Sequence, residues 1–173
     1  FMHQGQICMS VEKILVQESI MPEFLARFKE RASKLKVGDP TKEMDHIIGP
    51  LINDHQVARV KEQIDDAVEK GANIVLGGKV DGRYVEPTIM TDVTPDMKLY
   101  QNETFGPVVP VIPFATDEEA IAIANDTEYG LSSGVITKDE YRGLEIAQKL
   151  ETGMCHINCS SVNDEPHAPF GGS

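Results

Sequence analysis

The sequence predicts an α/β fold, with a mostly parallel sheet and helices on both faces. Over residues 108–158, short runs of branched apolar residues alternate with amphipathic segments in the order strand, helix, strand, helix, strand. Such alternation with short links favours parallel pairing and right-handed crossovers. The length of 173 residues, with 40% hydrophobic and 25% charged residues, fits one globular domain with a substantial core.

The first two thirds of the chain predict three strands and two helices. Strands are expected at residues 13–17, 74–76 and 84–90. Pro87 favours an edge or irregular position for the last of these strands. The first helix is expected to follow Pro22 and to end at residues 37–40, and the second to begin with Asp54 as its cap and to stop at Gly71.

The last third of the chain gives the clearest pattern. Strands are expected at residues 108–112, 134–137 and 154–158, the first of them despite Pro110. Helices are expected at residues 117–125 and 138–150. Ligands of such sheets bind at the carboxyl ends of the strands, so the functional site is expected there.

The composition argues against several classes of partner. The chain has 16 Lys and Arg against 28 Asp and Glu, a net charge of −12, which argues against binding to nucleic acid or to anionic membranes. No apolar run approaches the ~20 residues of a membrane span, and no signal peptide opens the chain. Three widely spaced cysteines fit a reducing compartment, so a cytoplasmic protein is expected.

Cys8 is the candidate nucleophile. It follows Gly5 by three residues and precedes the first expected strand. Glycine permits a turn that brings backbone N–H groups near the sulfur. A thiol becomes a good nucleophile only where such dipoles or a nearby base favour the thiolate. The alternative is that Cys8 is a small buried hydrophobic residue.

Cys155 and Cys159 are interpreted as packing residues. Alternation along a strand places them on one face together with Ile157. A zinc site built on both thiols would need two further ligands, such as His167 and Asp164, and the spacing matches none of the usual structural zinc patterns. The sequence therefore predicts no metal site.

Glu103 and Phe105 lie in a segment that enters a Gly-Pro turn before an expected strand. The carboxylate suits the hydroxyls of a sugar diol, and the ring suits the face of a flat heterocycle. A solvated Glu and a Phe that anchors the turn are the alternative. The chain contains neither a Gly-x-Gly-x-x-Gly fingerprint nor a P-loop, so it predicts no phosphate cradle of its own.

Five motifs, taken in order, resemble the NAD(P)-dependent aldehyde dehydrogenase superfamily. They are Gly5-Gln6-Ile7-Cys8, Glu103-Thr104-Phe105-Gly106-Pro107, residues 125–131, Gly153 with Asn158, and Pro169-Phe170-Gly171-Gly172. The resemblance covers the whole chain. It implies that residues 1–173 are the catalytic domain of a longer protein, without its cofactor-binding domain and its C-terminal oligomerisation strand. It also implies that the parent protein is a homodimer or a homotetramer.

The resemblance implies a role for each matching residue. Cys8 matches the nucleophile, which would form a thiohemiacetal with an aldehyde, pass a hydride to NAD or NADP, and leave a thioester for water to hydrolyse. Glu103 matches the residue that holds the nicotinamide ribose, and Phe105 matches the ring beside the nicotinamide. Gly5, Gln6 and Asn158 match family positions that have a structural role near the thiol.

The substrate implied by the resemblance is an aromatic aldehyde such as benzaldehyde, salicylaldehyde or vanillin. The pocket for it is expected to be lined by Phe1, Met2, Ile7, Met9 and Phe170. A short aliphatic aldehyde or a semialdehyde is the alternative, although a semialdehyde would need an Arg or Lys beside the catalytic motif. The general base and the second oxyanion donor of the family lie outside this chain, so no appreciable turnover is expected from it alone.

Two other classes of function are alternatives. One is a thiol acyl-transfer or hydrolytic enzyme, in which Cys8 is activated by His3, His156 or His167. The other is a zinc-binding module with the ligands Cys155, Cys159 and His167. Neither alternative accounts for the Glu-Thr-Phe-Gly-Pro and Pro-Phe-Gly-Gly motifs together.

Overall fold

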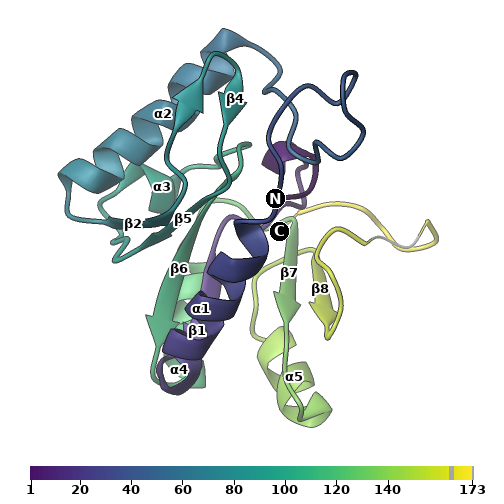
Figure 1. The fold of residues 1–173 in the computed structure, drawn as a ribbon. Helices are drawn as coiled ribbons and strands as arrows, with labels where there is room; N and C mark the ends of the chain where they lie inside the picture. The colour runs from purple at the N-terminus through teal and green to yellow at the C-terminus, as the bar shows by residue number, and fades with distance from the viewer. Residues whose placement is uncertain (164–165, 173) are drawn as a thin grey trace. The chain divides into compact units, whose positions relative to one another are not determined.

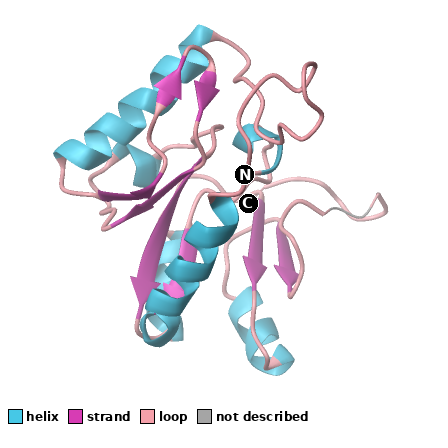
Figure 2. Cartoon of the chain, viewed as in Figure 1, coloured by secondary structure: helices cyan, strands magenta, loops and turns pink. Residues whose placement is uncertain are grey.

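A four-stranded sheet forms the centre of the first part of the molecule. The computed structural model describes residues 1–163 and 166–172, which divide into two units, Phe1–Pro113 and residues 114–173 (Figures 1 and 2). The sheet of the first unit has the order β1-β6-β5-β2. These strands span Ile14–Gln17 (β1), Val108–Phe114 (β6), Thr88–Thr91 (β5) and Asn73–Leu76 (β2). β5 and β6 are parallel, whereas β2 is antiparallel to β5.

The helix α1 (Met21–Ala32) packs against this sheet (Figure 1). Its residues Phe24, Leu25 and Phe28 lie against a cluster that includes Ile89 of β5. Because alternate residues of a strand point to opposite faces, the neighbouring Met90 faces the other side, and its side chain is also fully buried. Both faces of the sheet are therefore covered at β5, as the α/β prediction requires.

The helix α2 spans Asp54–Glu69, and its N-cap lies one residue before Asp54, the cap that the sequence predicts. Asn53 is extended and its Oδ1 accepts a hydrogen bond from the N–H of Gln56 at 2.9 Å, so Asn53, not Asp54, is the N-cap. Asp54 instead lies in the first turn, where its charge suits the positive end of the helix dipole. The short helix α3 (Lys98–Gln101) follows later and is tied to α2 by a hydrogen bond from the Lys98 N–H to Asp66.

The single strand expected at residues 84–90 is two strands in the structure. Residues Tyr84–Val85 (β4) pair in a hairpin with Val80–Asp81 (β3), and Thr88–Thr91 forms β5 of the main sheet. Pro87 lies between them and has no N–H to donate to a ladder, which explains the break. Two short 3₁₀ helices, Met2–Gly5 (η1) and Glu18–Ile20 (η2), complete the first unit.

The second unit contains a parallel two-stranded sheet and two helices. β7 (Ser132–Val135) pairs with β8 (Met154–Ile157), as the prediction of parallel pairing requires, although β7 lies two residues earlier than expected. α4 spans Asp117–Asn125, the predicted range. α5 spans only Glu140–Ala147, because Asp139 is extended and caps it through the Arg142 N–H.

None of the helices in the described residues is both long enough and apolar enough to cross a bilayer.

Candidate active site

Cys8 lies at the tip of a tight turn. The N–H of Ser10 donates to the carbonyl of Ile7 at 2.9 Å, so Cys8 and Met9 are the two central residues of the turn. The thiol is free and the residue is exposed. A nucleophile must be reached by its substrate, and this turn supplies that access.

Gly5 brings the Cys8 segment against a second motif that lies about one hundred residues away in the chain. Gly5 is buried and has a φ of +71°, and a Cβ atom at this position would lie 2.2 Å from the carbonyl oxygen of Gly106. Only glycine allows this approach of two backbones. Next to it, Gln6 Oε1 accepts a hydrogen bond from the N–H of Ile52 at 2.9 Å. The segments that carry Cys8 and the Glu103–Phe105 motif therefore lie in direct contact.

Helix α2 holds the carbonyl groups of the Glu103–Phe105 segment. Gln56 Nε2 donates to the carbonyls of Thr104 and Phe105 at 2.7 and 3.0 Å. Arg59 Nη2 donates to the carbonyl of Glu103 at 2.6 Å, and Gln63 Nε2 donates to the same oxygen at 3.2 Å. Phe105 has a φ of +46°, an unusual conformation for an L residue that these contacts maintain. The backbone that presents Glu103 and Phe105 is thus fixed by side chains of one helix.

An open hollow of about 320 Å³ lies beside the two motifs. Its lining residues are His3, Gln6, Ile52, Gln56, Arg59 and Phe105. The lining combines polar side chains with the rings of His3 and Phe105, which suits a polar ligand that has a flat portion. Gln6, which lies two residues before Cys8, and Phe105 both line it, so the predicted motifs share one hollow.

Sequence reasoning missed Gln56 and Arg59. Their side chains line the hollow and bind the Glu103–Phe105 backbone, but the bonded carbonyls are 44 to 49 residues away in the chain. The only local signal is the position of both residues in the first two turns of α2, after the Asn53 cap. Helical polar residues at such positions are ordinarily solvent-facing, so no pattern distinguishes them.

Glu12 adds a half-buried acidic group to the same region. Its Oε2 accepts a hydrogen bond from the N–H of Thr104 at 2.9 Å. Burial raises the pKa of the Glu12 carboxyl and the nearby charge of Glu103 adds to this, while hydrogen bonding by Thr104 and by the Phe105 backbone opposes it.

The five residues expected to line the substrate pocket differ in their burial and in their contacts. Phe1 stacks its ring on Phe28, with 5.7 Å between the ring centroids, and packs against the core cluster of the first unit. Phe1 therefore packs on the core with one side of its ring and remains half-buried. Met2 is exposed, and Ile7 and Met9 are half-buried on either side of Cys8.

Asn158 and Phe170 lie in the second unit. Asn158 Oδ1 accepts the N–H of Thr137 at 2.9 Å, and its own N–H donates to Val135, so it joins the ends of β7 and β8. Phe170 is 55% exposed. The Gly171 carbonyl that follows it lies so close to Gly153 that a Cβ atom there would be 1.7 Å away.

Three of the family motifs therefore meet in the second unit. The Gly153 N–H donates to the carbonyl of Gly130 at 2.8 Å, and Gly172 also lies beside Gly130. Residues from 125–131, from the Gly153 region and from 169–172 thus contact one another, which explains why glycine recurs at all three places.

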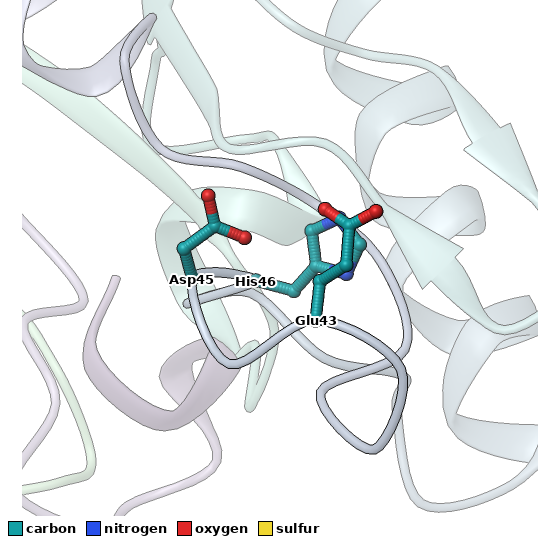
Figure 3. Close-up of side chains that lie close together, drawn as sticks. All are labelled: Glu43, Asp45 and His46. Atoms are coloured by element: carbon teal, nitrogen blue, oxygen red, sulfur yellow. The ribbon is translucent and has the colours of Figure 1, made fainter.

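The zinc hypothesis finds no support in the described residues. There, Cys155, Cys159 and His167 do not form a group with metal-ligand spacing, and Asp164 lies outside the described residues. The group that does have such spacing is Glu43, Asp45 and His46, whose ligand atoms lie within 4.8 Å of one another (Figure 3). Asp45 is ion-paired with Lys36, and both carboxylates are exposed, so we assign no ion to this loop.

The thiol–histidine hypothesis also lacks a contact. In the described part of the first unit, no histidine is hydrogen-bonded to the Cys8 thiol. His3, the candidate in this unit, is exposed and lines the hollow. An activating base for acyl transfer must be within hydrogen-bond reach of the sulfur.

Fold and site together define an α/β protein with an exposed thiol on a segment that also lines, through Gln6, an open hollow. The profile of the aldehyde dehydrogenase family matches residues 1–173, so the chain belongs to the aldehyde dehydrogenase family. The chain is 44% identical over 172 residues to the benzaldehyde dehydrogenase (NAD(+)) of Pseudomonas putida, which covers 99% of this chain and 35% of that protein.

Solved structures agree with this assignment. A salicylaldehyde dehydrogenase from Pseudomonas putida G7, complexed with salicylaldehyde, superimposes with a TM-score of 0.95 at 46% identity, over 98% of this chain and 35% of that one. The glyceraldehyde-3-phosphate dehydrogenase GapN from Methanocaldococcus jannaschii, complexed with NADP, superimposes with a TM-score of 0.94 at 40% identity, over 100% of this chain and 37% of that one. The chain thus spans about a third of the length of the proteins it matches.

Proposed function

We propose that residues 1–173 are the catalytic part of a longer aldehyde dehydrogenase, in which Cys8 is the nucleophile. The observation that carries the proposal is the contact of Gly5 with Gly106, which sets the exposed Cys8 turn against the segment of Glu103 and Phe105. Family membership supports the same chemistry, and the matched length of about a third of each relative supports a longer protein.

In the proposed reaction, the Cys8 thiolate adds to the aldehyde carbon and forms a thiohemiacetal. The backbone N–H of Cys8 donates to the oxygen that becomes negative in this step, and one such donor is typically worth ~3 kcal/mol. When bound, NAD or NADP supplies the acceptor for the hydride. Cys8 then carries the acyl group as a thioester, which water hydrolyses to the carboxylic acid and the free thiol.

Glu103 and Phe105 are the residues that we propose to contact the cofactor. We propose that the Glu103 carboxylate accepts hydrogen bonds from ribose hydroxyls and that the Phe105 ring, which lines the hollow, packs against the flat nicotinamide ring. The residues present fit these parts of the cofactor, because the hollow combines an aromatic ring with polar donors. The relative GapN supports this choice of cofactor, because it was solved with NADP.

We propose an aromatic aldehyde as the substrate. The names of the benzaldehyde and salicylaldehyde dehydrogenase relatives support this choice. Half-buried Ile7 and Met9 flank Cys8 and supply apolar surface for a ring.

Steady-state kinetics of the whole protein test the proposal. Benzaldehyde, salicylaldehyde and vanillin are compared with short aliphatic aldehydes and semialdehydes, each with NAD and with NADP. Aromatic aldehydes are expected to give the largest kcat/KM. Cys8→Ala is expected to lower turnover at least about a thousandfold, because the covalent step is lost. Cys159→Ser, in the second unit, serves as the matched control and retains activity.

Two results would overturn the proposal. Full dehydrogenase activity in Cys8→Ala would contradict Cys8 as the nucleophile. A clear preference for aliphatic aldehydes would contradict the aromatic substrate but not the role of Cys8. The isolated 173-residue chain is expected to be inactive, since the family's general base lies outside it.

We also propose that the whole protein is cytoplasmic and a homodimer or homotetramer that binds neither nucleic acid nor membranes. The three free thiols support a reducing compartment, and the net charge of −12 argues against polyanionic partners. Light scattering of the whole protein measures its assembly state.

A further inference from the structure

Glu12 links the Cys8 segment to the Glu103–Phe105 segment through its side chain. It lies four residues after Cys8, between the turn and β1, and its Oε2 accepts the N–H of Thr104 at 2.9 Å. Ninety-two residues separate the two partners in the chain. Thr104 is 1% exposed, so this N–H has no access to water as a substitute partner.

The contact complements those made by α2. Gln56, Arg59 and Gln63 bind the carbonyl groups of the Glu103–Phe105 segment, whereas Glu12 binds its N–H side. The peptide groups next to Glu103 and Phe105 are thereby held from two directions, and the second contact comes from the segment between the Cys8 turn and β1. Displacing Glu12 would release the segment only from the side of Cys8.

A carboxylate at this position is energetically unfavourable. In the described residues no basic side chain forms a salt bridge with Glu12, and the charge that faces it from the partner segment is that of Glu103. The ammonium of the adjacent Lys13 lies over the ring of Tyr100, 3.7 Å from its centroid, and Arg59 donates to the Glu103 carbonyl. Burial without a cation disfavours the charged form, so a neutral glutamine would be easier to bury.

The carboxylate has one property that glutamine lacks. Both of its oxygens can accept hydrogen bonds; Oε2 accepts the N–H of Thr104 at 2.9 Å, and the Phe105 backbone also lowers the pKa of the carboxyl. A glutamine offers one accepting oxygen and one donating nitrogen. A carboxylate can therefore bind the Thr104 N–H with either oxygen and presents no donor to the segment, at a cost in stability that is typical of residues that serve a site.

We propose that Glu12 is a positioning residue: it fixes the Thr104 and Phe105 backbone so that Glu103 and Phe105 hold the nicotinamide end of NAD(P) beside Cys8. The proposal rests on the proposed function. It predicts that Glu12 affects cofactor binding and hydride transfer and has little effect on the intrinsic reactivity of the thiol.

The test compares Glu12→Gln, Glu12→Ala and the control Glu18→Gln in the whole protein. Glu18 is exposed in η2, so its variant is expected to behave as wild type. Glu12→Ala is expected to raise KM for the cofactor and lower kcat, with kcat/KM reduced about tenfold or more, as the loss of one buried hydrogen bond implies. The rate of Cys8 alkylation by iodoacetamide is expected to change less than about twofold, since no contact to the sulfur is removed.

Glu12→Gln separates positioning from stability. Because it keeps one acceptor, its kcat/KM is expected to lie between those of wild type and Glu12→Ala, while its melting temperature at neutral pH is expected to exceed that of wild type. A residue with a structural role alone would not combine higher stability with weaker cofactor use. Hydrogen exchange without cofactor gives a second measurement, and faster exchange is expected at residues 103–106 in Glu12→Ala.

Wild-type cofactor KM and wild-type exchange in both Glu12 variants would overturn the proposal. If Glu12→Ala does not fold, Glu12→Gln decides alone, through its kinetics and exchange. If the wild-type protein oxidises no aldehyde, the proposed function fails, while the exchange experiment still decides whether Glu12 holds the segment.

Discussion

The two units of the chain share the α/β pattern but differ in how much they bury. Every buried hydrophobic side chain in the described residues belongs to the first unit, from Val16 in β1 to Ile112 in β6. Among the described residues of the second unit only Gly143 is buried, and Ile136, Tyr141 and Leu144 are exposed. A four-stranded sheet covered on both faces forms a core, whereas a two-stranded sheet does not. The proposed site residues Cys8, Glu103 and Phe105 all lie in the unit that has the core, and a packed core suits a site that needs a fixed geometry.

The largest expected effect tests this difference in packing. Ile89→Ala, at a fully buried position of β5, is expected to lower the free energy of unfolding by about 3 kcal/mol, because it removes apolar contacts and leaves a cavity. The matched change Leu144→Ala, at a side chain 49% exposed in the second unit, is expected to stay within about 0.5 kcal/mol. Urea denaturation measures both. Equal effects would show that the second unit also depends on a packed core.

A pair of glycines gives the next largest effect and bears on the site. Gly5→Ala meets both a positive φ and the Gly106 carbonyl, and is expected to lower the free energy of unfolding by more than about 2 kcal/mol. Gly71→Ala also has a positive φ, but no atom lies within 4 Å of its Cβ position, so a cost of about 1 kcal/mol is expected. Thermal denaturation compares them. A Gly5 variant as stable as the Gly71 variant would contradict the close contact between the two motifs.

The sequence predicted those elements whose signals are local. Helix α4 matches its predicted range, because Thr116 caps it and three acidic residues fill its first turn. The hairpin β3–β4 was missed although Asp81-Gly82, with Gly82 at φ +55°, is a turn signal that the Tyr84–Met90 run obscured. The antiparallel pairing of β2 with β5 has no local signature, because it depends on which strands meet in the folded sheet.

The site was less predictable than the fold. The turn at Cys8 follows from local sequence. By contrast, Gly5 and Gly106 are about 100 positions apart, and Thr104 and Glu12 are 92 positions apart. Composition and spacing carry no information about such pairs. The resemblance to a family supplied Glu103 and Phe105, whereas Gln56, Arg59 and Glu12 became visible only once the backbone was folded.

The smallest expected effects lie in the pH dependence of stability, where the two units are expected to have opposite signs. In the second unit, Arg142 donates to both oxygens of Asp117 at 2.6 and 2.5 Å, and this ion pair lowers the pKa of Asp117. A lowered pKa in the folded state means that the contribution is present above the ordinary aspartate pKa and is lost as pH falls through the lowered value. Arg142→Gln is therefore expected to be less stable than wild type at neutral pH, by a small amount because the pair is partly exposed, with the difference vanishing in strong acid.

In the first unit, Glu12 is expected to give the stability of the protein the opposite dependence on pH. Its raised pKa means that the folded protein binds the proton more tightly than the unfolded chain, so stability falls as pH rises from the ordinary glutamate pKa through the raised one. Glu12→Gln removes that loss, and its advantage over wild type is expected to be absent in strong acid and to grow toward neutral pH. Unfolding free energies of the two variants, measured from pH 3 to pH 7 against wild type, are therefore expected to diverge in opposite directions. Parallel curves would mean that partial burial does not raise the pKa of the Glu12 carboxyl in the folded protein.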